Sequence, residues 1–201
     1  SMEPMNCVAQ ISSDGIEMWY GCQGPTMDQY AVASALGIKP DQVKINTLFA
    51  GGSFGRRANK DSDFVVEAAL IAKACSSDSP IKLVWTREDD TRSGYFRPMY
   101  YHKMKAGLNA EGRIVAWEHK IVGQSIISGT AFEAKAVKNG VDSSSVEGAI
   151  ELPYDFENCT VRLHTMETQV PVLWWRSVGS SHTAHAVETF MDQLSQTIGL
   201  D

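Results

Sequence analysis

The sequence lacks any apolar run of the ~18–20 residues that a membrane-spanning helix needs. It also lacks a Lys/Arg-rich block, and its 18 basic residues against 24 acidic ones leave a net charge of −6. A nucleic-acid-binding surface is therefore not expected. With 43% hydrophobic and 21% charged residues, the composition is not that of a disordered protein. The length of 201 residues suits one domain with a substantial core.

Cysteine is scarce, and no two cysteines form the CxxC pairs that are typical of zinc knuckles or thioredoxin-type redox sites. Because free cysteine packs as a small apolar side chain, we expect ordinary reduced thiols. The four residues are Cys7, Cys22, Cys75 and Cys159.

The histidines form no metal-binding pattern, so no metal ligand is predicted. His182 and His185 are three residues apart and could share a helix face, but a catalytic zinc site needs at least a third ligand. We expect solvated or packing roles for both. The sequence also has no Gly-x-Ser-x-Gly elbow, although residue counts alone leave a Ser/His/Asp triad open.

Hydropathy patterns predict an α+β fold with mixed sheets, hairpins and packed helices. Thr26 and Gln29 have the spacing of a capping box at the start of a helix that Gly37 ends. Residues 126–146 are expected to form a surface excursion. The expected strands are Ala9–Ile11, Ile16–Tyr20, Val43–Phe49, Ile81–Trp85, Tyr100–Leu108, Arg113–Val122 and Val161–His164. The expected helices are Thr26–Leu36, Ser62–Cys75, a short one at Phe132–Val137, and one from a cap at Ser180 or Ser181 to Gly199.

A glycine-rich loop, residues 50–57, lies between an expected strand and an expected helix. Without a Cβ, Gly51, Gly52 and Gly55 let the backbone approach an anion or a cofactor closely. Successive N–H groups of such a loop can converge on oxygen atoms. The spacing is neither a Walker loop nor the GxGxxG fingerprint. A tight strand-to-helix turn is an equal alternative.

Two further polar residues are candidates for chemistry. The amide of Gln23 can donate a hydrogen bond to an oxo group or a carbonyl, although a surface turn residue is the simpler interpretation. Arg176 follows Trp174 and Trp175, so its guanidinium could be buried or stacked and could anchor negative charge. A structural cation–π contact or salt bridge is the alternative for Arg176.

Taken together, the motifs resemble the large, molybdenum-binding subunit of the xanthine dehydrogenase and aldehyde oxidase family, in the bacterial branch typified by the isoquinoline 1-oxidoreductase beta subunit. The segments occur in the family's order and extend over nearly the whole chain. They are Met2–Cys7, Gln23–Pro25, Gly51–Arg57, Val84–Asp90, Tyr95–Pro98 and Trp175–Gly179.

The resemblance implies a molybdenum-dependent hydroxylase that inserts oxygen from water into an aldehyde or an N-heterocycle. It implies a molybdopterin cofactor, expected as the cytosine dinucleotide, and electron transfer to an iron–sulfur partner subunit. Arg176 then faces the substrate, with Ser177 and Val178 replacing the Gly and Phe of the wider family. The wider family often has Gln at the position of His182. The residues implied to approach the cofactor are Gln23, Gly51, Gly52, Ser53, Phe54 and Gly55.

Family members are several times longer, which implies that residues 1–201 are a single fragment of the first molybdopterin-binding domain. The family's general-base glutamate lies in a Gly-Glu context further along, and Val187-Glu188-Thr189 is not that motif. We therefore expect this fragment alone to be inactive and to bind no cofactor. Two rivals are a stand-alone small-molecule or anion-binding module, and an interaction protein that uses Trp174 and Trp175. The compartment, cytoplasmic or exported, stays open.

Overall fold

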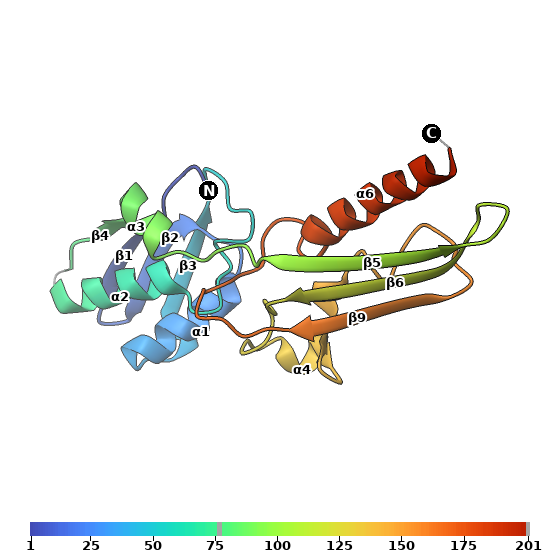
Figure 1. The fold of residues 1–201 in the computed structure, drawn as a ribbon. Coiled ribbons are helices and arrows are strands. Elements are labelled where there is room, and N and C mark those ends of the chain that lie inside the picture. Colours follow the sequence, from blue (N-terminus) through green and yellow to red (C-terminus); the bar gives the residue numbers. More distant parts are fainter. Residues whose placement is uncertain (76–77, 200–201) are drawn as a thin grey trace. The chain divides into compact units, whose positions relative to one another are not determined.

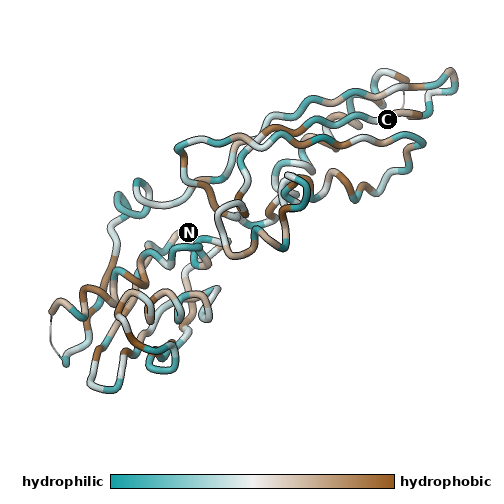
Figure 2. Tube along the Cα trace, turned by 90° about the horizontal axis from the view of Figure 1, so that it is seen from below, coloured by the Kyte–Doolittle hydropathy of each residue, from teal (hydrophilic) through white to brown (hydrophobic). Residues whose placement is uncertain are grey.

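The computed structural model describes residues 1–75 and 78–199, and the chain divides into two compact units. Unit 1 is Ser1–Tyr95 and unit 2 is Phe96–Asp201. The sequence around Tyr95 and Phe96 does not have the composition of a linker, so the division into two units could not be predicted from it. Hydrophobic and hydrophilic stretches alternate along the chain in both units (Figure 2). The α+β prediction is confirmed, since each unit combines strands with helices.

Unit 1 is a four-stranded mixed sheet with two long helices (Figure 1). The strand order is β3-β2-β1-β4, in which β2 and β3 run parallel and the other neighbours are antiparallel. Its elements are β1 (Asn6–Ser12), β2 (Gly15–Gly21), α1 (Pro25–Leu36), η1 (Pro40–Gln42), β3 (Val43–Leu48), α2 (Asp63–Cys75), β4 (Ile81–Val84) and α3 (Arg87–Arg92).

The core of unit 1 is one continuous apolar cluster between the sheet and the helices α1 and α2. Alternate residues of β1 and β2 face inward, as the period-2 pattern of a half-buried strand requires. Helix α2 contributes Phe64, Ala68 and Ala72, which repeat with the period of a helix and are buried against the sheet. The ring of Tyr20 meets the edge of Phe64 at a centroid distance of 5.7 Å. This packing fixes the ends of β2 and α2, from which the predicted site residues extend.

Unit 2 is built on a three-stranded sheet of order β5-β6-β9, with helix α6 beside it (Figure 1). The pair β5 and β6 forms the predicted hairpin, and β9 runs parallel to β6. Trp117 is buried between Phe156, stacked at 4.7 Å, and Phe190 of α6. Its elements are β5 (Tyr100–Leu108), β6 (Ile114–Gly123), α4 (Glu133–Ala136), β7 (Val137–Lys138), β8 (Val141–Asp142), α5 (Ser143–Val146), β9 (Cys159–Thr165) and α6 (Ser180–Ile198).

Both predicted helix caps are wrong, although the helices themselves are present. Helix α1 begins at Pro25, and its N-cap residue, Gly24, has no side chain that could cap it. Gln29 lies inside the helix and donates to the carbonyl of Val43. Proline at the first helical position already supplies the required φ and has no N–H to satisfy. Helix α6 follows Gly179, again without a side-chain cap. The glycine ends predicted for both helices are confirmed, since Gly37 and Gly199 are left-handed.

Candidate functional site

Gln23 and the glycine loop come together at one end of unit 1. Gln23 follows β2, and its side-chain Oε1 accepts hydrogen bonds from the backbone N–H groups of Gly55, at 3.1 Å, and Arg57, at 3.2 Å. Its own N–H donates to the carbonyl of Arg57. The N–H groups of Gly55 and Arg57 fix the orientation of the side-chain amide, because only its oxygen can accept their hydrogen bonds. Exposed Gln23 therefore presents its Nε2 as a donor beside the loop.

The glycine loop has a strained backbone that only particular residues can adopt. Gly52 and Gly55 have φ values of +98° and +103°, and Phe54 has the rarer value of +55° for a residue with a side chain. A Cβ at Gly52 would lie 2.7 Å from the ring of Phe54, and one at Gly51 would lie 2.6 Å from Cβ of Glu3. The loop backbone therefore requires glycine at Gly51 and Gly52, as either a tight turn or a binding loop would.

An ion pair between Arg57 and Glu3, which was not predicted from the sequence, binds the backbone of this loop. Buried Arg57 donates to Glu3 at 2.9 Å and to the carbonyls of Gly52 and Gly21. Glu3 accepts the N–H of Gly51 at 2.6 Å, and this bond is the main reason that the pKa of its carboxyl is lowered. Burial lowers the pKa of the Arg57 guanidinium. Several N–H groups of the loop thus donate to side chains of the protein itself. Fewer of them than predicted are available to donate to an oxygen of a bound molecule.

A buried carboxylate, Asp28, ties the two ends of the site together. It accepts hydrogen bonds from Tyr20 at 2.8 Å, Cys22 at 3.2 Å and Ser62 at 2.7 Å. Tyr20 and Cys22 precede Gln23, and Ser62 precedes α2 with a φ of +48°. Burial raises the pKa of Asp28, and it raises the pKa of the Cys22 thiol to about 11. Asp28 therefore fixes both chain segments that position the loop and Gln23.

The neighbouring Arg56 is held by a separate set of partners. Its guanidinium forms two hydrogen bonds with Asp63, at 3.2 and 2.8 Å, in the parallel arrangement that arginine and carboxylate favour. It also lies near the rings of Trp85 and Tyr95, at 5.5 and 5.4 Å. Two adjacent arginines directly after a glycine loop were the sequence signal that could have indicated these ion pairs. Both arginines are buried in the structure.

Arg176 lies in unit 2, in a segment with its own unusual backbone. Ser177 and Val178 have φ values of +69° and +40°, which is strained for a β-branched residue such as Val178. A Cβ at Gly179 would lie 2.1 Å from the carbonyl of Ser144, so this position requires glycine. Arg176 is exposed, which excludes burial, one of the two placements expected for its guanidinium. The guanidinium of Arg97 lies over the ring of Trp175, 5.8 Å from the ring centroid.

The predicted roles of the remaining polar residues are partly confirmed. All four cysteines are free, as expected. His185 is exposed, while His182 packs on Tyr100 with ring centroids 3.6 Å apart. Within the described part of the chain, no three His, Cys, Asp or Glu side chains are grouped as metal ligands. No helix there has both the length and the apolar character that crossing a membrane requires.

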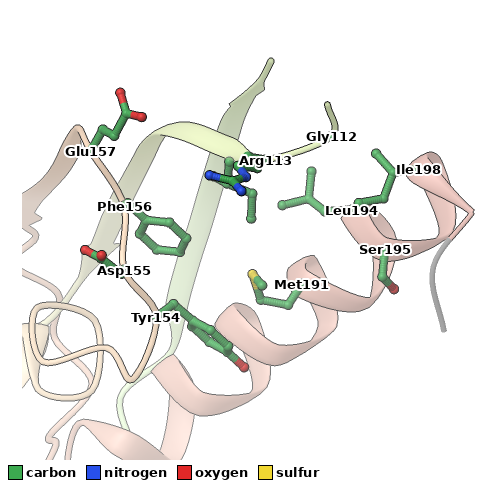
Figure 3. Close-up of a pocket in the computed structure, with 11 residues that line it drawn as sticks. Gly112, Arg113, Tyr154, Asp155, Phe156, Glu157, Met191, Leu194, Ser195 and Ile198 are labelled. Atoms are coloured by element: carbon green, nitrogen blue, oxygen red, sulfur yellow. The ribbon is translucent and has the colours of Figure 1, made fainter. Parts of the chain in front are cut away.

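A pocket of about 520 Å³ lies in unit 2 between α6 and the loop that precedes β9. Figure 3 shows its apolar side chains facing one another, with the carboxylates of Asp155 and Glu157 pointing away from them. It contains none of the predicted site residues. The apolar side chains that line it are Ile114, Tyr154, Phe156, Met191, Leu194 and Ile198.

Comparison with known proteins identifies one family over the whole chain, the molybdopterin cofactor-binding domain, matched by residues 1–201. The chain is 30% identical over its full length to isoquinoline 1-oxidoreductase subunit beta of Brevundimonas diminuta, of which it covers 25%. It is 27% identical over 96% of its length to a membrane-bound aldehyde dehydrogenase of Gluconacetobacter polyoxogenes, of which it also covers 25%. The crystal structure of quinoline 2-oxidoreductase from Pseudomonas putida 86 has the same fold, with a TM-score of 0.81 and 19% identity. The match covers all of this chain and 25% of that one.

Proposed function

Because the chain belongs to the family of molybdopterin cofactor-binding domains, we propose that it forms one part of the active site of a molybdenum hydroxylase subunit. The proposed substrate is an aldehyde or an N-heterocycle, oxidised with oxygen from water. The names of two relatives support this class, since one is an isoquinoline oxidoreductase and the other an aldehyde dehydrogenase. The chain spans about a quarter of these relatives, so the activity is proposed for a protein of their length.

The geometry of Gln23 is the observation that carries the proposal. A cofactor with oxygen atoms needs donors that do not rotate away, and the Gln23 amide is held with its Nε2 outward by two backbone N–H groups. The glycines beside it are required for the loop conformation, because a Cβ at Gly51 or Gly52 would collide with Glu3 or Phe54. The proposed cofactor is molybdopterin cytosine dinucleotide, which supplies the two-electron oxidation. The residues proposed to hold it are Gln23, Gly51, Gly52, Ser53, Phe54 and Gly55.

Arg176 is proposed to face the substrate rather than the cofactor. Oxygen transfer to an aromatic or carbonyl carbon pushes negative charge onto a neighbouring substrate atom, and a fixed guanidinium stabilises that charge most in the transition state. The exposed position of Arg176 in a strained segment supports this role. The general base is proposed to lie outside these 201 residues, as are the iron–sulfur clusters, on a partner subunit. The 201 residues alone are proposed to be inactive and free of cofactor.

Cofactor loading tests the proposal in a protein of the relatives' length that carries this chain. Gly52→Val should lower its molybdenum content severely, because valine cannot adopt a φ of +98° and would meet Phe54. Gly140→Val is the matched control, since Gly140 also has positive φ but a Cβ there meets nothing within 4 Å. Equal molybdenum content in the two variants, measured by elemental analysis, would refute the role of the loop.

The role of Arg176 is tested by kinetics in the same protein. Arg176→Met should lower kcat/KM about 10²–10³-fold, the effect of losing one preorganised donor. Arg176→Lys should recover only part of the loss, because lysine lacks the planar fork of arginine. Molybdenum content is measured for each variant, so that poor loading is not mistaken for slow chemistry. Normal loading with unchanged turnover in both variants would make Arg176 a structural residue.

A further inference from the structure

One face of the unit 2 sheet is cationic, in a chain whose net charge is −6. Helix α6 packs on the other face, where Phe190 contacts Trp117 of β6. Because the side chains of a strand alternate between the two faces of a sheet, every second residue points away from α6. Strands β5, β6 and β9 contain four lysine and arginine residues, all of which point away from α6, and only one acidic residue. We call this side the cationic face, and its charged residues are Lys103, Lys105, Lys120, Arg162 and Glu118.

The strand register places three of these cations in one row across the sheet. Lys103 of β5 is opposite Lys120 of β6, and Lys120 is opposite Arg162 of β9. Neighbouring strands are only about 4.8 Å apart. Since like charges directly opposite each other destabilise a sheet, this row lowers the stability of the chain when nothing is bound to it.

The single carboxylate cannot neutralise the cationic face. Glu118 lies 3.3 Å from the ammonium of Lys120 and 3.8 Å from the guanidinium of Arg162. The hydrogen bond with Lys120 is the main reason that the pKa of Glu118 is lowered. Lys103 and Lys105 are exposed, and neither forms an ion pair within the described part of the chain. Their charges are therefore free to attract an anion from outside.

We propose that the cationic face binds an acidic segment of a partner protein. The carboxylates of that segment pair with Lys103, Lys105 and Arg162, and they relieve the repulsion within the row. Tyr101 and Val122 lie opposite each other in the next row of the same face, and the side chain of Tyr101 is 64% exposed. An exposed aromatic ring close to an arginine is typical of a protein–protein interface.

The position of Glu118 favours a protein segment over a nucleic acid. Glu118 is opposite Lys105 in the strand register, so a negative charge lies among the cations. A nucleic acid carries a phosphate at every nucleotide, and both Glu118 and the net charge of −6 repel such a continuous polyanion. A protein segment can place an uncharged or basic side chain opposite Glu118 and carboxylates on either side of it.

A hollow of about 350 Å³ gives one side chain of such a segment a place to lie. It is present beside the row of three cations because Gly107 and Ala116, which are opposite each other, have little or no side chain. Lys105 and Arg162 also line it, so an acidic side chain in the hollow would meet two cations.

An acidic peptide tests the proposal in the 201-residue chain. The probe is an acetylated peptide of alternating glutamate and serine, because alternate residues of an extended segment point to the same side. At low ionic strength it should shift the amide NMR signals of β5, β6 and β9. In about 1 M salt the shifts should disappear, because charges are then screened beyond about 3 Å. No shift in these strands at low ionic strength would overturn the proposal. The test needs no cofactor, so its result is independent of the proposed function.

Two double variants with the same net charge separate this face from general attraction. Lys103→Gln with Arg162→Gln should weaken peptide binding about fivefold to tenfold, as expected for the loss of two exposed ion pairs. Lys135→Gln with Lys138→Gln is the control, because both lysines are exposed in unit 2 on α4 and β7. Equal weakening in the two double variants would overturn the proposal.

Two further measurements test the chemistry of the partner. The exchange of Lys103→Arg with Arg162→Lys keeps both charges and should keep the peptide affinity within about twofold. A single-stranded oligothymidylate of the same charge as the peptide should bind more weakly. Tighter binding of the oligothymidylate to β5, β6 and β9 would overturn the choice of a protein partner and assign this face to nucleic acid.

Discussion

The two units bury polar groups in different ways. Among the described residues, unit 1 surrounds its polar network with fifteen buried apolar residues in one cluster, while the corresponding cluster of unit 2 has three. The carboxylate of Asp28 in unit 1 has three donors. In unit 2, the ring of buried His119 and the half-buried rings of His102 and His182 have mainly one another as hydrogen-bond partners. A large apolar core can hold a strained loop in place, whereas a small core depends on aromatic and imidazole contacts.

The largest effect is expected when the aromatic support of unit 2 is removed. Trp117→Ala should lower the free energy of unfolding of unit 2 by about 3–5 kcal/mol, because it leaves a cavity against Phe156 and Phe190. Hydrogen exchange should quicken in β5 and β6 and stay unchanged in β1. Tyr101→Ala, at a position that is 64% exposed, should cost less than about 0.5 kcal/mol. Equal losses of protection in both units would show that their stabilities are not separate.

A smaller effect is expected from the buried carboxylate of unit 1. Asp28→Ala should destabilise unit 1 by about 3 kcal/mol, because the buried hydroxyls of Tyr20 and Ser62 lose their acceptor. Asp41→Ala, at an exposed position in η1, should stay within about 0.5 kcal/mol of the wild type. Urea unfolding followed at residues of each unit measures both. A loss of less than about 1 kcal/mol for Asp28→Ala would mean that water replaces the carboxylate.

The smallest effect is a difference in the response of the two units to acid. The folded-state pKa of about 4 for His119 and His182 lies below the ordinary value of 6.5, so the unfolded chain binds protons first as the pH falls. Unit 2 should therefore be fully stable above pH 6.5 and lose stability between pH 6.5 and 4. Asp28 has a raised pKa, so the folded form of unit 1 binds its proton first and gains stability as the pH falls.

Residue-resolved thermal unfolding between pH 7 and 5 measures this opposition. In that range Glu118 of unit 2, whose pKa is lowered mainly by its hydrogen bond with Lys120, stays ionised and does not add to the response of the histidines. His119→Phe should remove part of the acid sensitivity of unit 2, and His164→Phe should leave it unchanged. An equal acid sensitivity of unit 2 in the wild type and in His119→Phe would contradict the sign assigned to the buried histidine.

Most elements of the fold could be predicted from the sequence, because their apolar residues repeat with the period of a strand or a helix. The predicted hairpin and the helix after the glycine loop agree with β5, β6 and α2 to within one or two residues. The pairing of β2 with β3, and of β6 with β9, could not be predicted, because partner choice depends on contacts between distant segments. The wrong cap of α1 shows the same limit, since the side chain of Gln29 donates to the carbonyl of Val43 on another element.

The candidate site was only partly visible in the sequence. The proximity of Gln23 to the glycine loop follows from the resemblance, whereas its oriented amide required the backbone of Gly55 and Arg57. Glu3 and Arg57 are 54 residues apart, and no local pattern links them. The hydrogen bonds of His102 reach His119, 17 positions away, and His182, 80 positions away, so this group appears only when the strand register is known.

The burial of the cysteines divides them in a way that is useful for labelling. Burial raises the pKa of Cys7 to about 12 and that of Cys22 to about 11, so neither is a ready nucleophile. Cys75 and Cys159 are exposed, and one belongs to each unit. A maleimide dye pair should therefore attach at these two thiols of the unaltered sequence. Energy transfer between the dyes then reports the distance between the units in solution, with no cysteine removed or added.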